Sequence, residues 1–172
     1  GNIMSLLFDD NFDGQTDLTG KNFIFFALFM DCSKLINAKN SSLPATTLAE
    51  LCYSEMFNGC TSLITAPELS ATTLADSCYS GMFYRCTSLV SAPELPATTL
   101  TYNCYSNMFN GCTSLTATPE LPATTLDDEC YHSMFEGCTS LTTAPSILPA
   151  TTLTDTCYCY MFYGCTSLTD AP

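Results

Sequence analysis

The stretch CYSEMFNGCTSL, residues 52–63, recurs along this chain of 172 residues. Its copies begin at Cys78, Cys104, Cys130 and Cys157. Successive copies begin 26, 26, 26 and 27 residues apart, and the last step is longer because APSILPATTL carries one residue more than APELPATTL. A fixed period of this length is the sequence signature of a protein built from stacked repeats. We therefore expect a solenoid in which each copy forms one coil.

The first half of each coil has the spacing of an amphipathic helix. Cys52, Met56, Phe57 and Cys60 fall at i, i+4, i+5 and i+8, which is one face of a 3.6-residue period. Asp76 and its equivalents precede the stretch as potential N-caps, and Gly59 and its equivalents stand where a left-handed residue ends many helices. The sequence predicts a helix of about three turns here.

The second half of each coil is predicted to be extended. It holds β-branched residues in TSLITAPEL, and a proline such as Pro67 ends the segment because proline cannot donate to a strand ladder. Strands stack about 4.8 Å apart, whereas packed helices need about 8–10 Å. We therefore expect an α/β, curved solenoid with a short helix on the convex side and a short parallel strand on the concave side of each coil.

Residues 1–48 are interpreted as degenerate N-terminal repeats and residues 49–172 as regular ones, the last of them truncated. Residues 11–19 align with residues 56–64 through Phe12, Gly14, Thr16 and Leu18. Residues 9–17 also resemble a calcium loop, although its twelfth position is Gly20 and not the expected glutamate. The prediction is a single domain, residues 1–172, of about seven coils.

The composition excludes several classes of partner. Seventeen acidic residues and four basic ones give a net charge of -13, which argues against nucleic acid and against anionic membrane surfaces. No apolar run approaches the roughly 20 residues that span a bilayer. The chain opens with Gly-Asn and has no signal peptide, so we expect it to be a piece of a longer protein.

Twelve cysteines allow three interpretations: buried free thiols, disulfides between coils, or a metal site. Cys52 and Cys60 would lie about 12 Å apart along a helix, too far for a disulfide. In a degenerate repeat Cys32 is kept while Ile24 fills the other cysteine slot, which favours packing. No tight pair of the C-x2-C kind that zinc prefers is present. We expect free, buried thiols and no metal.

Three other features are interpreted as structural. His132 occupies a slot that holds serine in other coils, so we expect it to face solvent and not to act as a catalytic base. The Thr-Thr pairs are expected to bond turn backbone, since a threonine ladder binds ice only on a flat stack. Tyr53 and its equivalents are expected to pack between helices, the alternative being an exposed tyrosine stripe suited to protein binding.

Slots that change from coil to coil mark the solvent face. One such slot holds Ile64, Val90, Thr116 and Thr142, and the next along the chain is equally variable. Strict strand alternation would turn one of these two slots inward. A third slot holds Glu68, Glu94 and Glu120, which would form an acidic stripe, either solvated or bridged by calcium. We predict that these seven residues form the binding surface.

The motif MF-x-G-C-[ST]-S-L, which recurs with a 26-residue spacing, resembles the BspA-like leucine-rich repeat of bacterial surface proteins. The likeness covers roughly residues 7–172 and departs from the commoner form at the first cysteine slot and in LPATTL. It implies a leucine-rich-repeat solenoid on a bacterial cell surface or in a secreted protein, with a role in adhesion or protein binding. The family motif contains no catalytic residues.

Two hypotheses of function follow. The first is a non-enzymatic interaction or adhesion module that binds a host or neighbouring-cell protein, without cofactors and as a monomer. The second is a structural spacer that holds another domain away from the cell envelope. An enzyme is a third possibility that no constellation of residues supports. Exposed slots that vary between coils favour binding over spacing.

Overall fold

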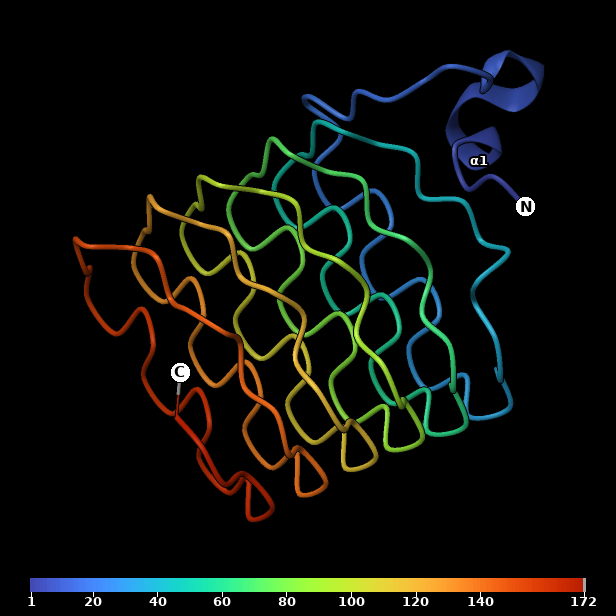
Figure 1. The fold of residues 1–172 in the computed structure, drawn as a ribbon. Coiled ribbons are helices and arrows are strands. Elements are labelled where there is room, and N and C mark those ends of the chain that lie inside the picture. Colours follow the sequence, from blue (N-terminus) through green and yellow to red (C-terminus); the bar gives the residue numbers. More distant parts are fainter. Residues whose placement is uncertain (172) are drawn as a thin grey trace.

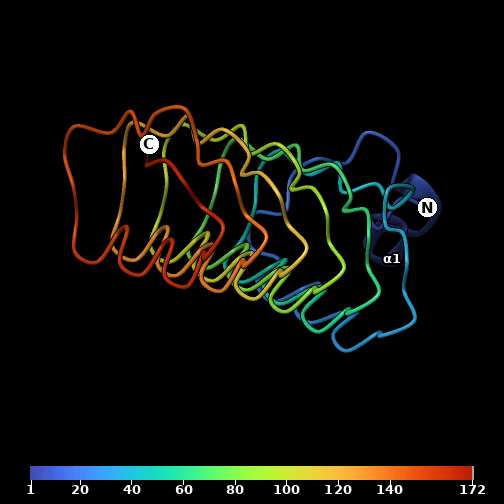
Figure 2. The same cartoon turned by 60° about the horizontal axis from the view of Figure 1, so that its bottom comes forward.

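The computed structural model describes residues 1–171, and it consists of coils stacked side by side along one axis (Figure 1). Its regular helices lie at the N-terminus: α1, Ser5–Phe8, and the 3-10 helix η1, Asp9–Asn11. From residue 23 onward the chain winds in flat coils, and each coil lies directly against the next (Figure 2). Regular secondary structure therefore contributes little to this fold.

One wall of the stack is made of β-turns. We call residues 51–60 and their equivalents in other coils the turn wall; the equivalents are 23–32, 77–86, 103–112, 129–138 and 156–165. In residues 49–60 the N–H groups of Cys52, Ser54, Met56, Asn58 and Cys60 each donate to the carbonyl three residues back. The result is a run of turns, each overlapping the next by two residues. A helix would instead close its hydrogen bonds over four residues.

Every fourth residue of the turn wall has a positive φ. In the coil that begins at Cys52 these residues are Leu51 (55°), Glu55 (54°) and Gly59 (72°). Each is the third residue of a turn, the position at which a type II turn requires positive φ. Most of these positions in the other coils are also not glycine, although left-handed backbone costs such residues about 1–2 kcal/mol each. The wall therefore needs a compensating interaction.

Hydrogen bonds between coils supply that interaction. The N–H groups of Leu51, Tyr53, Glu55, Phe57 and Gly59 donate to carbonyls of the next coil over 2.9–3.1 Å. These donors alternate with the donors that close the turns, so each N–H from Leu51 to Cys60 has a partner. The same five bonds join each pair of neighbouring turn walls from residue 23 to residue 163. Buried backbone groups are thereby satisfied without a helix or a strand.

The predicted convex helix is therefore wrong. The buried residues of the turn wall lie in two columns spaced by four residues: Cys52, Met56 and Cys60, and Tyr53 and Phe57. Over ten residues, a period of four and a period of 3.6 select nearly the same positions. Arg85 stands in the slot that holds Gly59 in the preceding coil, and its φ of 56° is left-handed like that of the glycines in the same slot.

The predicted strands are also absent from the described residues. The extended half of each coil makes isolated parallel bridges, such as Asn37 with Thr65 and Thr65 with Ser91. A second set joins the Thr pairs, including Thr47 with Thr73. Between the two sets lies the proline predicted to interrupt pairing, and no backbone hydrogen bond joins residues 66–71 to residues 92–97.

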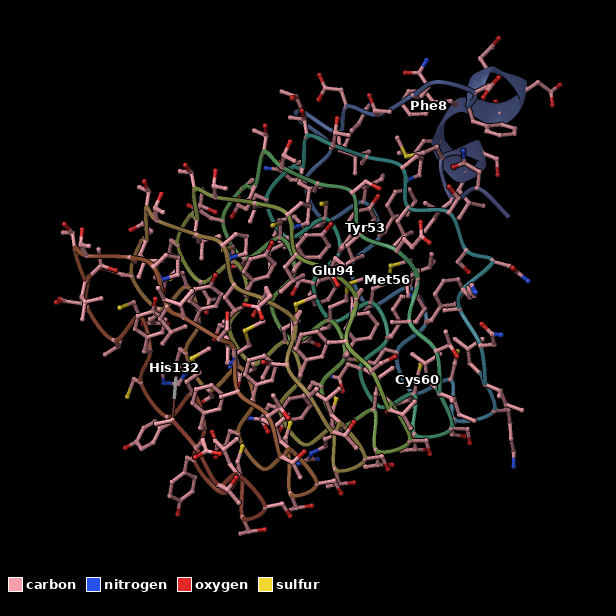
Figure 3. All side chains as sticks on the ribbon, in the orientation of Figure 1. Phe8, Tyr53, Met56, Cys60, Glu94 and His132 are labelled. Carbon is pink, nitrogen blue, oxygen red and sulfur yellow. The ribbon has the colours of Figure 1, made fainter. Side chains whose placement is uncertain are left out.

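Two columns of aromatic rings run through the core. Tyr53, Tyr79, Tyr105 and Tyr131 are buried, and they extend a stack that begins at Phe25 and ends at Tyr158, with ring centroids 5.6–5.9 Å apart. A parallel column from Phe29 to Phe162 has spacings of 5.4–5.7 Å. Tyr53 and Met56 are labelled within this core in Figure 3. The alternative of an exposed tyrosine stripe is therefore wrong for these four residues.

The spacing of the rings also removes the argument for curvature. That expectation rested on helices held about 8–10 Å apart on the convex side. In the turn walls, the ring centroids of neighbouring coils are instead only 5.4–5.9 Å apart. This spacing is close to that of the bridged backbone in the extended half of each coil. Two walls with similar spacing impose no strong bend.

Cysteines fill two further columns. All twelve are free, and nine are buried. In the second column five thiols donate to the phenylalanine carbonyl of the preceding coil, those of Cys60, Cys86, Cys112, Cys138 and Cys165. The Sγ of Cys86, for example, lies 3.1 Å from the carbonyl oxygen of Phe57. Burial raises the pKa of Cys52 and Cys86 to about 12, so these thiols are neutral at physiological pH. Cys32 is exposed, unlike its equivalents in later coils.

The N-terminal segment joins the stack in a different register from the predicted one. Asp17 forms a parallel bridge with Thr47, and the carbonyl of Thr16 accepts from the N–H groups of Thr46 and Thr47. Residues 16–18 are therefore equivalent to the Thr-Thr-Leu end of a coil, so the alignment of residues 11–19 with residues 56–64 is wrong. Leu18 is fully buried, as this equivalence requires. Residues 9–11 form η1 rather than part of a calcium loop.

Thiol reactivity tests the cysteine columns. A thiol reagent should label Cys32 in the native protein and reach the nine buried cysteines only after unfolding, because only the thiolate reacts and burial suppresses it. Mass spectrometry of the labelled protein at pH 7.5 measures this. Fast native labelling of Cys78, or disulfides in the unreduced protein, would contradict the buried-thiol arrangement.

Melting temperatures test the left-handed turns. Glu55→Gly and Glu55→Ala remove the same charge, but only glycine adopts φ near 54° without strain. The glycine variant should melt about 2–4 °C above the alanine variant, a difference that corresponds to roughly 1 kcal/mol. Asn58 does not have a positive φ, so there the alanine variant should melt above the glycine variant. If glycine gave the higher melting temperature at both positions, or alanine did at both, the assigned turns would be contradicted.

Candidate interaction surface

The extended half of each coil carries all the residues predicted to bind a partner. We call residues 64–70 and their equivalents 90–96, 116–122 and 142–149 the proline segment. Leu63 and Leu69 point into the core and are buried, whereas Ile64 and Glu68 are exposed. Each proline segment is therefore anchored by its leucines and presents its variable residues to solvent.

The variable slot forms a graded row on this surface. Ile64 and Val90 are 45% and 46% exposed, and Thr116 and Thr142 are exposed as well. The N–H of Thr142 donates to the carbonyl of Thr116 over 3.0 Å, and the Oγ1 of Thr142 contacts the same oxygen at 3.1 Å. The row changes from apolar to hydroxylated residues along the stack.

Ile36 extends this row and was not predicted. It is 59% exposed, and its carbonyl accepts the N–H of Ile64 over 2.8 Å. The signal in the sequence was the alignment of Leu35 with Leu63, which places Ile36 beside Ile64. The apolar end of the row thus comprises Ile36, Ile64 and Val90.

The neighbouring slot also faces solvent. Val90 and Ser91 are both exposed, as are Thr142 and Thr143. The expectation that one of the two slots turns inward is therefore wrong, because alternation requires a pleated strand and these segments make only isolated bridges.

The three glutamates form what we call the acidic row. Glu68, Glu94 and Glu120 are all exposed (Glu94 is labelled in Figure 3). Side chains in this slot reach one another across coils, since the Oγ of Ser146 donates to the Oε2 of Glu120 over 2.9 Å. Within the acidic row no carboxylate is bonded to a Lys or Arg of residues 1–171, so a cationic partner would find these groups free.

Shallow hollows lie between the proline segments. One, of about 340 Å³, lies between residues 65–70 and residues 91–94 and has Glu68 and Glu94 at its border. A second, of about 450 Å³, is shared by Lys39 and Glu68. A third, of about 230 Å³, includes Thr142 and Ser146. The structure thus brings Glu68 and Glu94 to one hollow and places Thr142 at another.

Unbonded backbone groups add to the chemistry of the first hollow. Pro67 and Pro93 have no N–H, and no backbone hydrogen bond joins residues 66–71 to residues 92–97. The exposed residues Glu68 and Glu94 therefore keep backbone N–H and C=O groups without a backbone partner in residues 1–171. The surface therefore offers apolar side chains, carboxylates and free backbone groups close together.

The remaining singled-out residues lie elsewhere. His132 is half-buried and packs edge-to-face on Tyr160, with centroids 6.0 Å apart. The Thr pairs form rows that are exposed except at the half-buried Thr47. Within residues 1–171 only Thr46 of these pairs directs its hydroxyl to a backbone carbonyl, that of Thr16 at 3.5 Å. The prediction that these hydroxyls bond turn backbone is therefore wrong for the other pairs.

Metal ligands are not assembled in the part of the chain that the structure describes. No group of three or more His, Cys, Asp or Glu side chains there is arranged to hold a metal ion. Nor does any helix within residues 1–171 have the length and apolar character needed to cross a bilayer.

Comparison with known proteins gives little direct guidance. No family model matches the chain, and no curated protein matches its sequence. Among solved structures, a leucine-rich repeat protein of T. pallidum is similar, with 20% sequence identity and a TM-score of 0.44 over 92% of this chain and 74% of that chain. A likeness of this degree transfers neither fold nor function.

Calcium addition tests whether the acidic row is solvated. Exposed charges are screened over about 8 Å at physiological salt, so the carboxylates need no bridging ion. Millimolar calcium should change the melting temperature by less than about 1 °C, both in the wild type and in Glu94→Gln. A bound ion at 100 times its dissociation constant would add about 2.7 kcal/mol. A rise of several degrees that Glu94→Gln abolishes would reveal a cation site.

Proposed function

We propose that this chain is a non-enzymatic protein-binding module, a leucine-rich repeat of the BspA-like type, that serves adhesion on a bacterial cell surface or in a secreted protein. The observation that carries the proposal is the contrast between core and surface. Buried slots repeat the same residue in coil after coil, whereas the exposed row from Ile36 to Thr142 changes. Packing of the core does not require the exposed row to change from coil to coil, so the change is better explained by binding.

The chemistry of the surface indicates the class of partner. Exposed Ile36, Ile64 and Val90 would bury apolar area, and the acidic row beside them would pair with lysine or arginine. Interfaces combine an apolar centre with a polar rim in this way. A protein with a mixed apolar and basic patch, from a host or a neighbouring cell, fits better than nucleic acid, which the net charge of -13 would repel.

Several features of the proposal come from the sequence alone. The chain acts as a monomer and as one domain of about seven coils, without cofactors, outside the cytoplasm. Free thiols are compatible with an oxidising location because nine of the twelve are buried, and oxidation to a disulfide requires an accessible thiolate. The alternative is a spacer, for which the uniform core would suffice and the graded row would have no role.

Site-specific crosslinking distinguishes binding from spacing. A photoreactive residue at Val90 should capture a discrete host or neighbouring-cell surface protein, whereas the same residue at Thr98, exposed among the Thr pairs of the same coil, should not. Ile64→Lys combined with Glu94→Lys should weaken the captured protein's affinity at least tenfold, since it replaces apolar contact and inverts a charge. Thr72→Lys combined with Thr98→Lys is the matched control.

Two results would contradict this function. Equal crosslinking from Val90 and Thr98 would show that the surface has no special role. Unchanged affinity in the doubly substituted protein, with its melting temperature preserved, would place the binding site elsewhere. If neither position captures a protein at the cell surface, the spacer hypothesis is the better one.

A further inference from the structure

The first turn wall has an outer edge whose backbone carbonyls lack hydrogen-bond partners within residues 1–171, although the ring of Phe25 is covered and only 2% exposed. In later coils the carbonyls at this edge accept hydrogen bonds from the preceding coil; Cys78 and Met82, for example, accept from Tyr53 and Phe57. In the first turn wall the equivalent carbonyls receive no hydrogen bond from a described residue. They belong to Asn22, Ile24, Phe26, Leu28 and Met30. We call residues 22–30 the open edge.

Side chains on the open edge are apolar where later coils are polar. Phe26 occupies the slot of Ser54, and Met30 occupies the slot of Asn58. Phe26 is 42% exposed, whereas Ser54 is 2% exposed because a preceding coil covers it. Ile24, Leu28 and Met30 are also exposed. Apolar residues at an uncovered edge indicate that another surface packs there.

The preceding segment of the chain passes by the open edge without pairing with it. Asn2 bridges to Ser42 and Asp17 to Thr47, both on the far side of the coil from the turn wall. α1 lies at this end of the stack (Figure 1). Between α1 and the first turn wall is a hollow of about 230 Å³, lined by Leu6, Phe29 and residues near the N-terminus.

The hydrogen bonds available at the open edge select the chemistry of its occupant. The edge offers carbonyl acceptors in a row and no N–H donors, since the donors of Phe23, Phe25, Ala27, Phe29 and Asp31 are bonded to the second turn wall. Two copies of the chain therefore cannot pair open edge to open edge, because both would present acceptors. An acyl chain would supply no donor at all.

The equivalent edges of the later coils are occupied, and their occupant indicates what an edge of this kind binds. Each later edge of this kind is filled by a turn-wall segment that donates five N–H groups at alternate residues and stacks two aromatic rings. We propose that the open edge is a second docking site, separate from the proline segments, and that its occupant is a turn-forming segment of the same repeat type carried by a partner protein.

A peptide with the sequence of residues 101–112 serves as the probe. It holds one complete turn wall, with Asn103, Tyr105, Asn107, Phe109 and Gly111 as the donors. Under reducing conditions the full chain should bind this peptide saturably below 1 mM, as measured by fluorescence anisotropy. N-methylation of Tyr105 and Phe109 should weaken binding at least tenfold, because it removes two donors and keeps both rings.

Substitutions taken from the chain's own repeats provide the matched variant. Phe26→Ser combined with Met30→Asn gives the first turn wall the residues that Ser54 and Asn58 hold in the next coil, so the fold should be retained. This variant should bind the peptide at least tenfold more weakly at an unchanged melting temperature. Ile64→Lys, on the proline segment, should leave peptide binding unaltered, so the two docking sites fail independently.

Three outcomes would overturn the proposal. The first is no saturable binding of the peptide by the wild type up to 1 mM. The second is equal binding of the methylated and unmethylated peptides. The third is a wild-type dimer in sedimentation that Phe26→Ser with Met30→Asn converts to monomer while the peptide neither binds nor competes, which would make the edge an apolar self-contact.

Discussion

The hydrogen bond from one turn wall to the next is the interaction on which this structure depends. It satisfies the N–H groups that the turns leave free, and it offsets the cost of residues such as Leu51 and Glu55 held at positive φ. It also fixes the distance between coils at a value that lets aromatic rings stack. Because each buried side chain then lies directly above its copy, a change of size in one coil is felt by both neighbours.

The repeat unit and the inward-facing residues could be predicted from the sequence, because both follow from identity between copies. Met56, Phe57, Leu63 and Leu69 recur unchanged in the regular coils, as core residues do, and all four are buried. Local conformation could not be predicted in this way. Ten residues with apolar side chains four apart fit a helix as well as they fit overlapping turns, and only the neighbouring coil, through its carbonyls, decides between them.

The candidate surface shows the same division. Ile64, Val90, Glu68 and Glu94 are exposed as their variability or charge suggested. Ile36 and the open edge were missed because they belong to a degenerate repeat, whose sequence differs too much from the regular copies for a slot-by-slot comparison. In the sequence, Phe26 and Met30 look like ordinary apolar residues. The structure shows that they occupy the slots of Ser54 and Asn58, which lie at a boundary between coils. Their meaning comes from what lies beside them in space.

The direction of the turn-wall bonds gives the stack an electrical polarity. Every such N–H points toward the C-terminal neighbour, whereas among the Thr pairs the bonds run both ways: Leu48 donates forward to Thr73, and Thr73 donates back to Thr46. The turn-wall dipoles therefore add along the axis and those of the Thr pairs largely cancel. An α-helix is positive at its N-terminal end. This stack has the opposite sense, with its negative pole at the carbonyls of residues 22–30, and each added coil lengthens the dipole.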